Sequence, residues 1–523
     1  MTTLKYTPIE EIEGIRNELR AGFASEKMKP VAYRKYQLQK LMYMVKDNMN
    51  KFEETLKSDL GRPNLESRFM ELIPSITEAL VQYKNVDKWS KPTKPPFNFN
   101  FFAMKPLIRK EPKGTILIIA PFNYPVWLLL SPLAGALAAG NTVLLKPSES
   151  TPATSALLEE VVGKYLDKDV VRVVNGAVPE TTKLLELQWD HTICTNNFGF
   201  LLITAGGPKV AKIVATAAAK HLTPVTLELG GKSPVIVDSS CDLKTTAKRL
   251  LWGKTVNAGQ TCVAPDYVLV PRDFQDTLIN ALKEVYEEFY PDASLRASAP
   301  EAYSRIVTPQ ATNRIAGLLE NTQGTVVIGG EVDKANKYIA PTIVKDVKPG
   351  DSLMSEEIFG PILPIVPVDN IEEAIKFVNE RDHPLALYVF SQDNQVKTKV
   401  FDKTQSGAAI ANEVVIHTGA DGLPFGGVGP SGYGMHTGIY SFEMFTHLRS
   451  SLDSPSWVDA VIKFRYPPYT KAKTDATMRL MGSLPARPTG PPVAGQKWWG
   501  KWFIVAFAVA LAGGLTQKWK RLH

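Results

Sequence analysis

The stretch Gly114-Thr-Ile-Leu-Ile-Ile-Ala-Pro-Phe-Asn-Tyr-Pro125 predicts a short strand that ends in a turn. Residues 115–120 are apolar or β-branched throughout, as in a strand whose two faces are both buried. Residues 126–139 then predict a helix, and Gly140 is a favourable residue just beyond a helix end. A buried strand followed closely by a helix is the repeating unit of α/β proteins.

The same alternation continues along the chain. We predict further strands at residues 142–145, 170–174 and 234–238, and helices at residues 152–166, 179–187, 209–220 and 243–256. Short connections between such units favour a doubly wound parallel sheet, and residues 28–91 predict a mainly helical cover. The expected fold class is therefore α/β, with a doubly wound parallel sheet and a second α/β domain. Ligands bind such sheets at the carboxyl ends of the strands.

A chain of 523 residues is expected to form two or three compact units. Its composition, 44% hydrophobic and 22% charged, is that of a globular protein. Three cysteines are too few for a disulfide framework and fit a reducing compartment. No Cys-x-x-Cys or His/Cys cluster is present, so no metal site is expected. The net charge of +7 is the sum of +8 in residues 471–523 and −1 in the remainder, and the near-neutral remainder argues against binding to nucleic acid.

Two short stretches contain the residues best suited to catalysis. Asn257-Ala-Gly-Gln-Thr-Cys262 places a thiol directly after a turn of small residues, where it can face a cleft. Leu227-Glu-Leu-Gly-Gly231 places one carboxylate, Glu228, inside an apolar run. A thiol nucleophile and a buried carboxylate base can together form and then hydrolyse a thioester. Taken separately, a cysteine is more often a small buried hydrophobic residue, and the carboxylate equally fits a structural ion pair.

Both stretches belong to longer motifs. Val225-Thr-Leu-Glu-Leu-Gly-Gly-Lys-Ser-Pro234, followed by Asn257 to Cys262, resembles the aldehyde dehydrogenase superfamily. The continuation Thr261-Cys-Val-Ala-Pro-Asp-Tyr-Val-Leu269 resembles the class 3 and fatty aldehyde dehydrogenase branch. The similarity extends over roughly residues 15–470, so an aldehyde dehydrogenase-like fold is expected.

The resemblance implies a role for each candidate. Cys262 would attack an aldehyde as a thiolate, and Glu228 would activate the water that releases the acid. The side-chain amide of Asn123 and the backbone N–H of Cys262 would stabilise the oxyanion. Cys194 and Cys241 lie outside the matching motifs and are expected to be structural.

Cofactor-binding residues are expected near the carboxyl ends of the first strands. Lys146-Pro-Ser-Glu149 follows a predicted strand, where a lysine and a carboxylate suit the two hydroxyls of an adenosine ribose. Gly206 and Gly207 open a helix whose free N–H groups suit a pyrophosphate oxygen. In the resembled family, Glu357 would bind the nicotinamide ribose and Phe359 would pack beside the ring. The complete expected set is Lys146, Glu149, Gly206, Gly207, Gly230, Glu357 and Phe359.

The expected cofactor is NAD. The carboxylate of Glu149 would repel the 2′-phosphate of NADP, but a glutamate that moves aside leaves NADP open. The G-x-G-x-x-G fingerprint is absent from this chain. Its absence suits the resembled family, whose cofactor domain departs from that fingerprint.

One segment departs from the family pattern. The connection at residues 192–205 is longer than expected and contains the apolar run Phe-Gly-Phe-Leu-Leu-Ile. Such a run is unfavourable in an exposed loop. It is either a real insertion or a translated intron, and the transcript sequence distinguishes the two. A real insertion would weaken cofactor binding, which leaves a catalytically impaired, membrane-tethered scaffold as the alternative function.

The last residues predict attachment to a membrane. Residues 471–497 predict a basic linker with prolines and glycines, and residues 498–519 predict a C-terminal anchor whose apolar run is flanked by tryptophans and lysines. A helix of that length rises roughly 33 Å, enough to cross a hydrocarbon core of roughly 30 Å. A helix lying in the interface is the alternative. We expect a protein that faces the cytosol from the endoplasmic reticulum, the mitochondrial outer membrane, peroxisomes or lipid droplets.

These observations combine into one predicted organisation. Membrane docking and the class 3 resemblance favour medium to long-chain aliphatic aldehydes as substrates, with aromatic aldehydes left open, and a homodimer is expected. The predicted domains are a dinucleotide-binding domain at 1–91 and 111–231, a catalytic domain at 232–424, an oligomerisation arm with C-terminal closure at 92–110 and 425–470, the linker at 471–497 and the anchor at 498–519.

Overall fold

The computed structural model describes residues 4–195, 206–291, 302–478 and 484–488 of the 523 in the sequence. The chain divides into two units. The first consists of Met1–Pro95 and Leu107–Ser451, and the second of Pro96–Pro106 and Leu452–His523.

Six strands among the described residues of the first unit form one sheet, in the order β16-β6-β5-β2-β3-β4. They are β2 (Thr115–Ile119), β3 (Thr142–Lys146), β4 (Val171–Val173), β5 (His191–Thr195), β6 (Val225–Glu228) and β16 (Gly432–Tyr433). Neighbouring strands are parallel except β16, which is antiparallel to β6. The strand order reverses between β2 and β5, and ligands bind α/β sheets at such a point.

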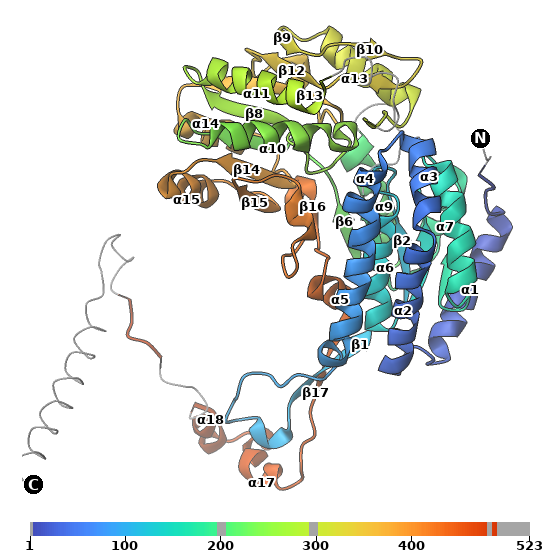
Figure 1. The fold of residues 1–523 in the computed structure, drawn as a ribbon. Coiled ribbons are helices and arrows are strands. Elements are labelled where there is room, and N and C mark those ends of the chain that lie inside the picture. The colour runs from blue at the N-terminus through green and yellow to red at the C-terminus, as the bar shows by residue number, and fades with distance from the viewer. Residues whose placement is uncertain (1–3, 196–205, 292–301, 479–483, 489–523) are drawn as a thin grey trace, which may run out of the picture. The chain divides into compact units, whose positions relative to one another are not determined.

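Helices cover both faces of this sheet (Figure 1). One face carries α6 (Trp127–Ala139) and α7 (Pro152–Tyr165), and against these pack α2 (Val31–Asp47), α3 (Met49–Leu60) and α5 (Ile73–Trp89). The other face carries α1 (Ile9–Ala24), α8 (Val178–Glu186) and α9 (Gly206–Ala219). Helix α4 (Asn64–Ser67) and the π-helical turn Arg68–Leu72 connect α3 to α5. The predicted doubly wound α/β fold is confirmed, and the predicted strands and helices of this sheet lie within a few residues of the observed ones.

Successive residues of β2 enter different apolar cores. Ile116 and Ile118 pack in the cluster on the α6 face, whereas Leu117 and Ile119 pack with Ile12 of α1 on the other face. All of them are fully buried. Adjacent side chains of a strand point to opposite faces, so a strand covered on both sides needs an unbroken apolar run.

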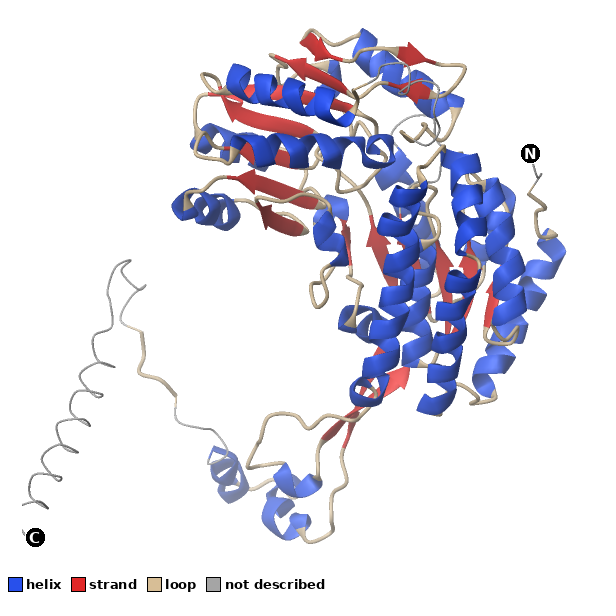
Figure 2. Cartoon of the chain, viewed as in Figure 1, coloured by secondary structure: helices blue, strands red, loops and turns tan. Residues whose placement is uncertain are grey.

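A second sheet of the first unit has seven strands among the described residues, in the order β15-β14-β7-β8-β13-β12-β9 (Figure 2). They are β7 (Pro234–Val237), β8 (Tyr267–Pro271), β9 (Thr325–Ile328), β12 (Thr342–Lys345), β13 (Ile362–Val368), β14 (Ala386–Phe390) and β15 (Ala408–Ala411). The helices that accompany it are α10 (Leu243–Thr255), α11 (Gln275–Phe289), α13 (Pro309–Glu320), α14 (Ile371–Asn379) and α15 (Asn394–Lys403). Strand β9 is antiparallel to β12, and the other pairs are parallel.

The first unit also has two small antiparallel sheets. Strand β1 (Leu107–Pro112) pairs with β17 (Thr446–Ser451), and β10 (Val332–Asp333) pairs with β11 (Tyr338–Ile339). Helix α16 (Ile439–Met444) precedes β17 and packs on α6. The division of the chain into the predicted domains stays a prediction.

The second unit contains a 3₁₀ turn at Phe102–Met104 and two short helices, α17 (Val458–Ile462) and α18 (Lys471–Met478). Helix α18 lies at the start of the predicted linker at residues 471–497, which stays a prediction. Residues 471–478 contain no proline or glycine, so nothing in them prevents a helix. None of the helices within the described ranges is long and apolar enough to cross a bilayer. The predicted anchor at residues 498–519 lies outside those ranges.

Candidate active site

The turn before Cys262 has an unusual backbone that only small residues fit. Helix α10 ends at Thr255, and Asn257 and Ala258 then adopt φ values of 53° and 52°, in the left-handed region. Gly259 follows with φ 73°, and a Cβ at this position would lie 2.3 Å from the carbonyl oxygen of Gly360. A glycine is required here, and the tight turn brings Cys262 to a half-buried position.

Hydrogen bonds hold the residues on both sides of Cys262. The hydroxyl of Tyr388 donates to the carbonyl oxygen of Val263 at 2.5 Å. On the other side, the hydroxyl oxygens of Thr261 and Tyr124 lie 2.7 Å apart in a hydrogen bond. The backbone that carries the thiol is therefore tied to β14 and to the turn after β2.

Asn123 lies in that turn after β2 and is connected to the Cys262 turn by a buried polar network. Nδ2 of Asn257 donates to the carbonyl oxygen of Asn123 at 2.9 Å. The guanidinium of Arg62 donates to the same carbonyl oxygen at 2.5 Å and to Oδ1 of Asn257 at 2.7 Å. Asn123 and Arg62 are at most 1% exposed. The predicted oxyanion residue and the cysteine turn are thus parts of one rigid assembly.

Glu228 is the last residue of β6 and is 2% exposed. The hydroxyl of Thr195, at the end of β5, donates to Oε2 of Glu228 at 3.3 Å. Nε2 of His436 lies 2.5 Å from Oε1 of Glu228, as an ion pair and not as an aligned hydrogen bond. Burial, the largest single influence, lowers the pKa of His436, but the charge and contact of Glu228 together with the charge of Glu78 raise it above its ordinary value.

Cys262 lies in the electrostatic field of two carboxyl groups. Burial raises the pKa of the Cys262 thiol, and the charges of Glu357 and Glu228 raise it further. The charge of Glu228 therefore acts on the Cys262 thiol. The predicted thiolate, however, is not the form that these surroundings favour, because burial and two negative neighbours stabilise the protonated thiol.

Glu357 and Phe359 lie on the loop that faces Gly230. A Cβ at Gly230 would lie 2.5 Å from Oε2 of Glu357, so the glycine makes room for this carboxyl group. Burial and the neighbouring charge of Asp266 raise the pKa of Glu357 to about 8. Phe359 has φ 46° and packs edge-on against Phe122, with ring centroids 5.9 Å apart. The structure brings these three predicted residues together.

Lys146 and Glu149 pair with each other at the carboxyl end of β3. Nζ of Lys146 lies 2.7 Å from Oε2 of Glu149, and the lysine side chain is fully buried. Helix α9 begins at Gly206, three residues before the predicted range of 209–220. The longer connection at residues 196–205 lies outside the described residues, so its two explanations stay open.

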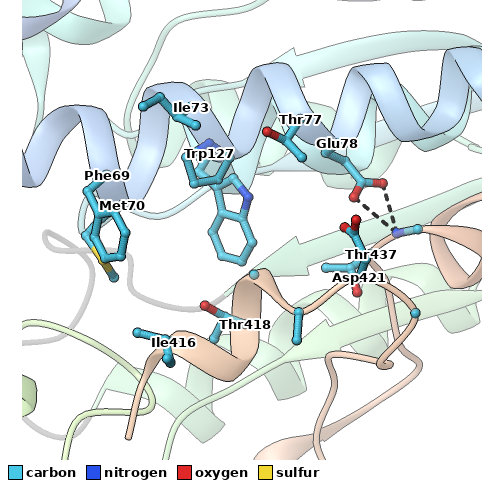
Figure 3. A pocket seen from close by; sticks show the side chains of 15 residues that line it. Phe69, Met70, Ile73, Thr77, Glu78, Trp127, Ile416, Thr418, Asp421 and Thr437 are labelled. Carbon is cyan, nitrogen blue, oxygen red and sulfur yellow. Dashed lines mark hydrogen bonds between the residues drawn. The ribbon is translucent and has the colours of Figure 1, made fainter. Parts of the chain in front are cut away.

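A pocket of about 280 Å³ lies beside Trp127 (Figure 3). Its apolar wall consists of Phe69, Met70, Ile73, Trp127 and Ile416. The carboxylates of Glu78 and Asp421 lie at the other end, with Thr437 beside Asp421 in Figure 3. Cys262 does not line the pocket, although its partly buried side chain and Met70 pack against the same apolar cluster.

The aldehyde dehydrogenase family model matches residues 2–451. The chain belongs to the aldehyde dehydrogenase family. Mouse aldehyde dehydrogenase family 3 member A2 is 42% identical over 455 residues, which are 87% of this chain and 91% of that protein. The dog enzyme described as dimeric and NADP-preferring is 40% identical, over 88% of this chain and 98% of its own. The substrate-bound structure of Staphylococcus aureus AldH has a TM-score of 0.84 at 38% identity, over 90% of this chain and 99% of that one.

The chain is therefore an NAD(P)-dependent aldehyde dehydrogenase of class 3. Its residues fit a dinucleotide. Gly230 leaves space beside the Glu357 carboxyl group, and Lys146 and Glu149 form a buried polar pair at the carboxyl edge of the sheet. Helix α9 begins at Gly206, and the first N–H groups of a helix have no partner within the helix and suit a phosphate oxygen.

Sequence reasoning missed Arg62, Glu71 and His436. All three are buried. Arg62 contacts Asn123 and His436 contacts Glu228, whereas Glu71 reaches the site through its ion pair with Arg62. Arg62 and Glu71 lie in what looked like a helical cover. One signal was available, because a Gly-Arg-Pro triplet at residues 61–63 interrupts that cover and a charged residue beside such a break can turn inwards. His436 gave no signal, because it lies in an irregular segment after a short motif.

Proposed function

We propose that this chain oxidises medium to long-chain aliphatic aldehydes to carboxylic acids with NAD, through a thioester on Cys262. The observation that carries the proposal is the convergence of three elements at one point. The Cys262 turn is tied to Asn123, and Glu228 is close enough to raise the pKa of the thiol.

The thiol must lose its proton before it attacks, because its surroundings favour the protonated form. A solvent water molecule accepts this proton, and the sulfur then bonds to the carbonyl carbon, so the Glu228 carboxylate stays ionised for the second step. The amide of Asn123 and the backbone N–H of Cys262 donate to the oxygen that becomes negative. Bound NAD would supply the hydride acceptor. Loss of the hydride from this carbon re-forms the carbonyl as a thioester on Cys262. Glu228 next removes a proton from water, the water oxygen bonds to the carbonyl carbon, and the C–S bond breaks to release the acid.

The cofactor is held by residues at the carboxyl edge of the first sheet. Lys146 and Glu149 bind the adenosine ribose, Gly206 and Gly207 present N–H groups to the pyrophosphate, and Glu357 binds the nicotinamide ribose. Phe359 packs beside the ring. NAD is preferred over NADP because the carboxylate of Glu149 disfavours a 2′-phosphate, although the dog relative is described as NADP-preferring.

The substrate class follows from the pocket beside Trp127. Its apolar wall suits an alkyl chain, and burial of such a chain contributes roughly 0.8 kcal/mol per CH₂ group. Glu78 and Asp421 at the other end disfavour an anionic aldehyde. A series of unbranched alkanals, compared by kcat/KM, tests the chain-length part of the proposal.

Replacing Glu228 with glutamine tests the base. Glu228→Gln is expected to retain the first turnover of NADH formation, because solvent water takes the thiol proton and Glu228 acts only in hydrolysis. Steady-state turnover should fall by about 10²-fold, because a neutral amide cannot accept the proton of the hydrolytic water. Rapid mixing with an alkanal measures both phases by NADH absorbance.

The control for this variant is Glu380→Gln, which changes an exposed carboxylate on the surface. It should leave both kinetic phases unchanged. A Glu228→Gln enzyme with the steady-state rate of the unmodified enzyme would remove Glu228 from the mechanism.

The membrane attachment and the oligomeric state are also part of the proposal. Residues 498–519 anchor the chain with its catalytic part in the cytosol, and tryptophans and basic residues flank the apolar run. We propose a homodimer with β1 and β17 in its arm, and the dog relative is described as dimeric.

Deleting residues 498–523 should move the protein from the membrane fraction to the soluble fraction with kcat unchanged for a short, water-soluble aldehyde. Fractionation followed by the NADH assay measures both quantities. Replacing only the two lysines that follow the apolar run, by Lys518→Gln with Lys520→Gln, should leave most of the protein in the membrane fraction. Sedimentation of the truncated chain with membranes would contradict the anchor.

A further inference from the structure

His436 occupies a position that the reaction as described does not use. Its side chain is 1% exposed, and its Nε2 lies 2.5 Å from Oε1 of Glu228. The ring packs against Trp127 and Phe425, with centroids 6.0 and 5.3 Å away. Nδ1 has no hydrogen-bond partner within the described part of the chain. Two aromatic rings therefore fix the plane of an imidazole whose charged partner is the proposed base.

The charged groups around His436 are carboxylates. Glu228 faces it from β6, and the charge of Glu78 acts on it from α5. The Oε1 and Oε2 atoms of Glu78 accept from the N–H of Gly438 at 3.0 and 3.1 Å, two residues beyond His436 (Figure 3). Asp421 adds a further negative charge near Glu78, and the packed rings of Trp127 and Phe425 carry none.

These surroundings determine how the ring titrates. Burial disfavours the imidazolium, but two carboxylates stabilise it, and the pKa of His436 is raised above its ordinary value of 6.5. Below this raised pKa, the imidazolium forms an ion pair with Glu228. Above it, the ring is neutral and the ion pair is lost.

We propose that His436 is a positioning residue that controls the basicity of Glu228 and so makes hydrolysis of the thioester depend on pH. The inference rests on the proposed role of Glu228. In the ion pair, the positive ring stabilises the carboxylate and weakens it as a base. When the ring loses its proton, Glu228 keeps the same position against Thr195 but removes the proton of the hydrolytic water more readily.

The sign of the effect follows directly. Hydrolysis of the acyl-enzyme should be slow below the pKa of His436 and should rise as the pH passes through it. The neutral fraction of a titrating group falls about tenfold for each pH unit below its pKa, so the rate should fall by about the same factor. Formation of the thioester need not follow this profile, because the thiol titrates in different surroundings.

The experiment compares His436→Gln with the unmodified enzyme. Glutamine is polar and uncharged, so it can fill the space and contact Glu228 without titrating. A single turnover with NAD and an alkanal forms the acyl-enzyme, and rapid quenching with intact-protein mass measurement follows its decay between pH 5.5 and 9. In the unmodified enzyme, we expect the rate of acyl-enzyme decay to change about tenfold per pH unit below the pKa of His436. In His436→Gln, we expect this rate to be nearly independent of pH.

The matched control is His447→Gln, which replaces an exposed histidine on β17 and should retain the pH dependence. A purely structural role would change the rate of His436→Gln equally at every pH and leave the slope intact, and that result would overturn the inference. Glu228→Gln separates the two proposals. If that variant hydrolyses its acyl-enzyme normally, the proposed function of Glu228 fails; if it does not, but His436→Gln keeps the slope, only this inference fails.

Discussion

Replacing Cys262 with serine is expected to lower kcat for aldehyde oxidation by at least about 10³-fold, because the reaction then lacks its nucleophile. Even the native thiol is held protonated by burial and by Glu357 and Glu228. A hydroxyl in the same place has a far higher pKa and is a poorer leaving group in the second step. Steady-state NADH formation with a short and a long alkanal measures the loss.

The fold should survive this substitution, because the turn around Cys262 is held by backbone and neighbouring side chains. Tyr388 and Thr261 make their hydrogen bonds without the sulfur. Cys241→Ser, at a half-buried thiol outside the site, is the matched control and should retain full activity. A Cys262→Ser enzyme with more than a tenth of normal kcat would show that another group attacks the aldehyde.

The fold could be predicted from the sequence wherever a short local pattern decides the structure. The apolar run of β2 is buried on both faces, and Gly140 ends α6 in a left-handed conformation, both as the residues indicate. The cysteine turn is a similar case, since Gly259 is needed where the backbone approaches Gly360. The residue pattern that indicates each of these features is local, even where the contact itself, as between Gly259 and Gly360, joins distant parts of the chain.

The electrostatic state of the site could not be predicted in this way. The thiolate expected at Cys262 follows from its chemistry in isolation, whereas its pKa depends on Glu357, 95 positions further along the chain. His436 and Glu228 meet because β16 pairs with β6 and the chain then turns back to bridge with Phe425. No local pattern encodes contacts between residues so far apart.

Arg62 is the clearest example of such a long-range contact. Its side chain is fully buried and forms an ion pair with Glu71. Oε2 of Glu71 also accepts from the backbone N–H groups of Val126 and Trp127, at 2.7 and 3.0 Å, where α6 begins. Arg62 therefore connects the helical cover to the start of α6 and, through Asn123, to the active site. One guanidinium compensates a buried carboxylate and fixes the oxyanion turn.

Arg62→Met should accordingly lower the free energy of unfolding by about 3–5 kcal/mol, because it leaves Glu71 charged, buried and without its cation. The loss should depend on pH. Burial raises the pKa of Glu71, and Arg62 opposes that shift. Without Arg62, the pKa of Glu71 in the folded state rises further, so its carboxyl group is protonated and uncharged at low pH. The loss of stability therefore grows as the pH rises above 4.5, the ordinary pKa of a glutamate. Urea unfolding at pH 5 and pH 8 measures both effects.

Two further variants separate the effect of the buried charge from other effects of the substitution. Arg272→Met breaks an exposed ion pair with Asp369 and should change the free energy of unfolding by less than about 1 kcal/mol at either pH. Adding Glu71→Gln to Arg62→Met removes the uncompensated charge, so it should recover part of the stability and abolish the difference between pH 5 and pH 8. It should not restore kcat/KM, because the hydrogen bonds from Arg62 to Asn123 and Asn257 are still missing. If Arg62→Met changes the free energy of unfolding as little as Arg272→Met at both pH values, the buried pair of Arg62 and Glu71 does not stabilise the site.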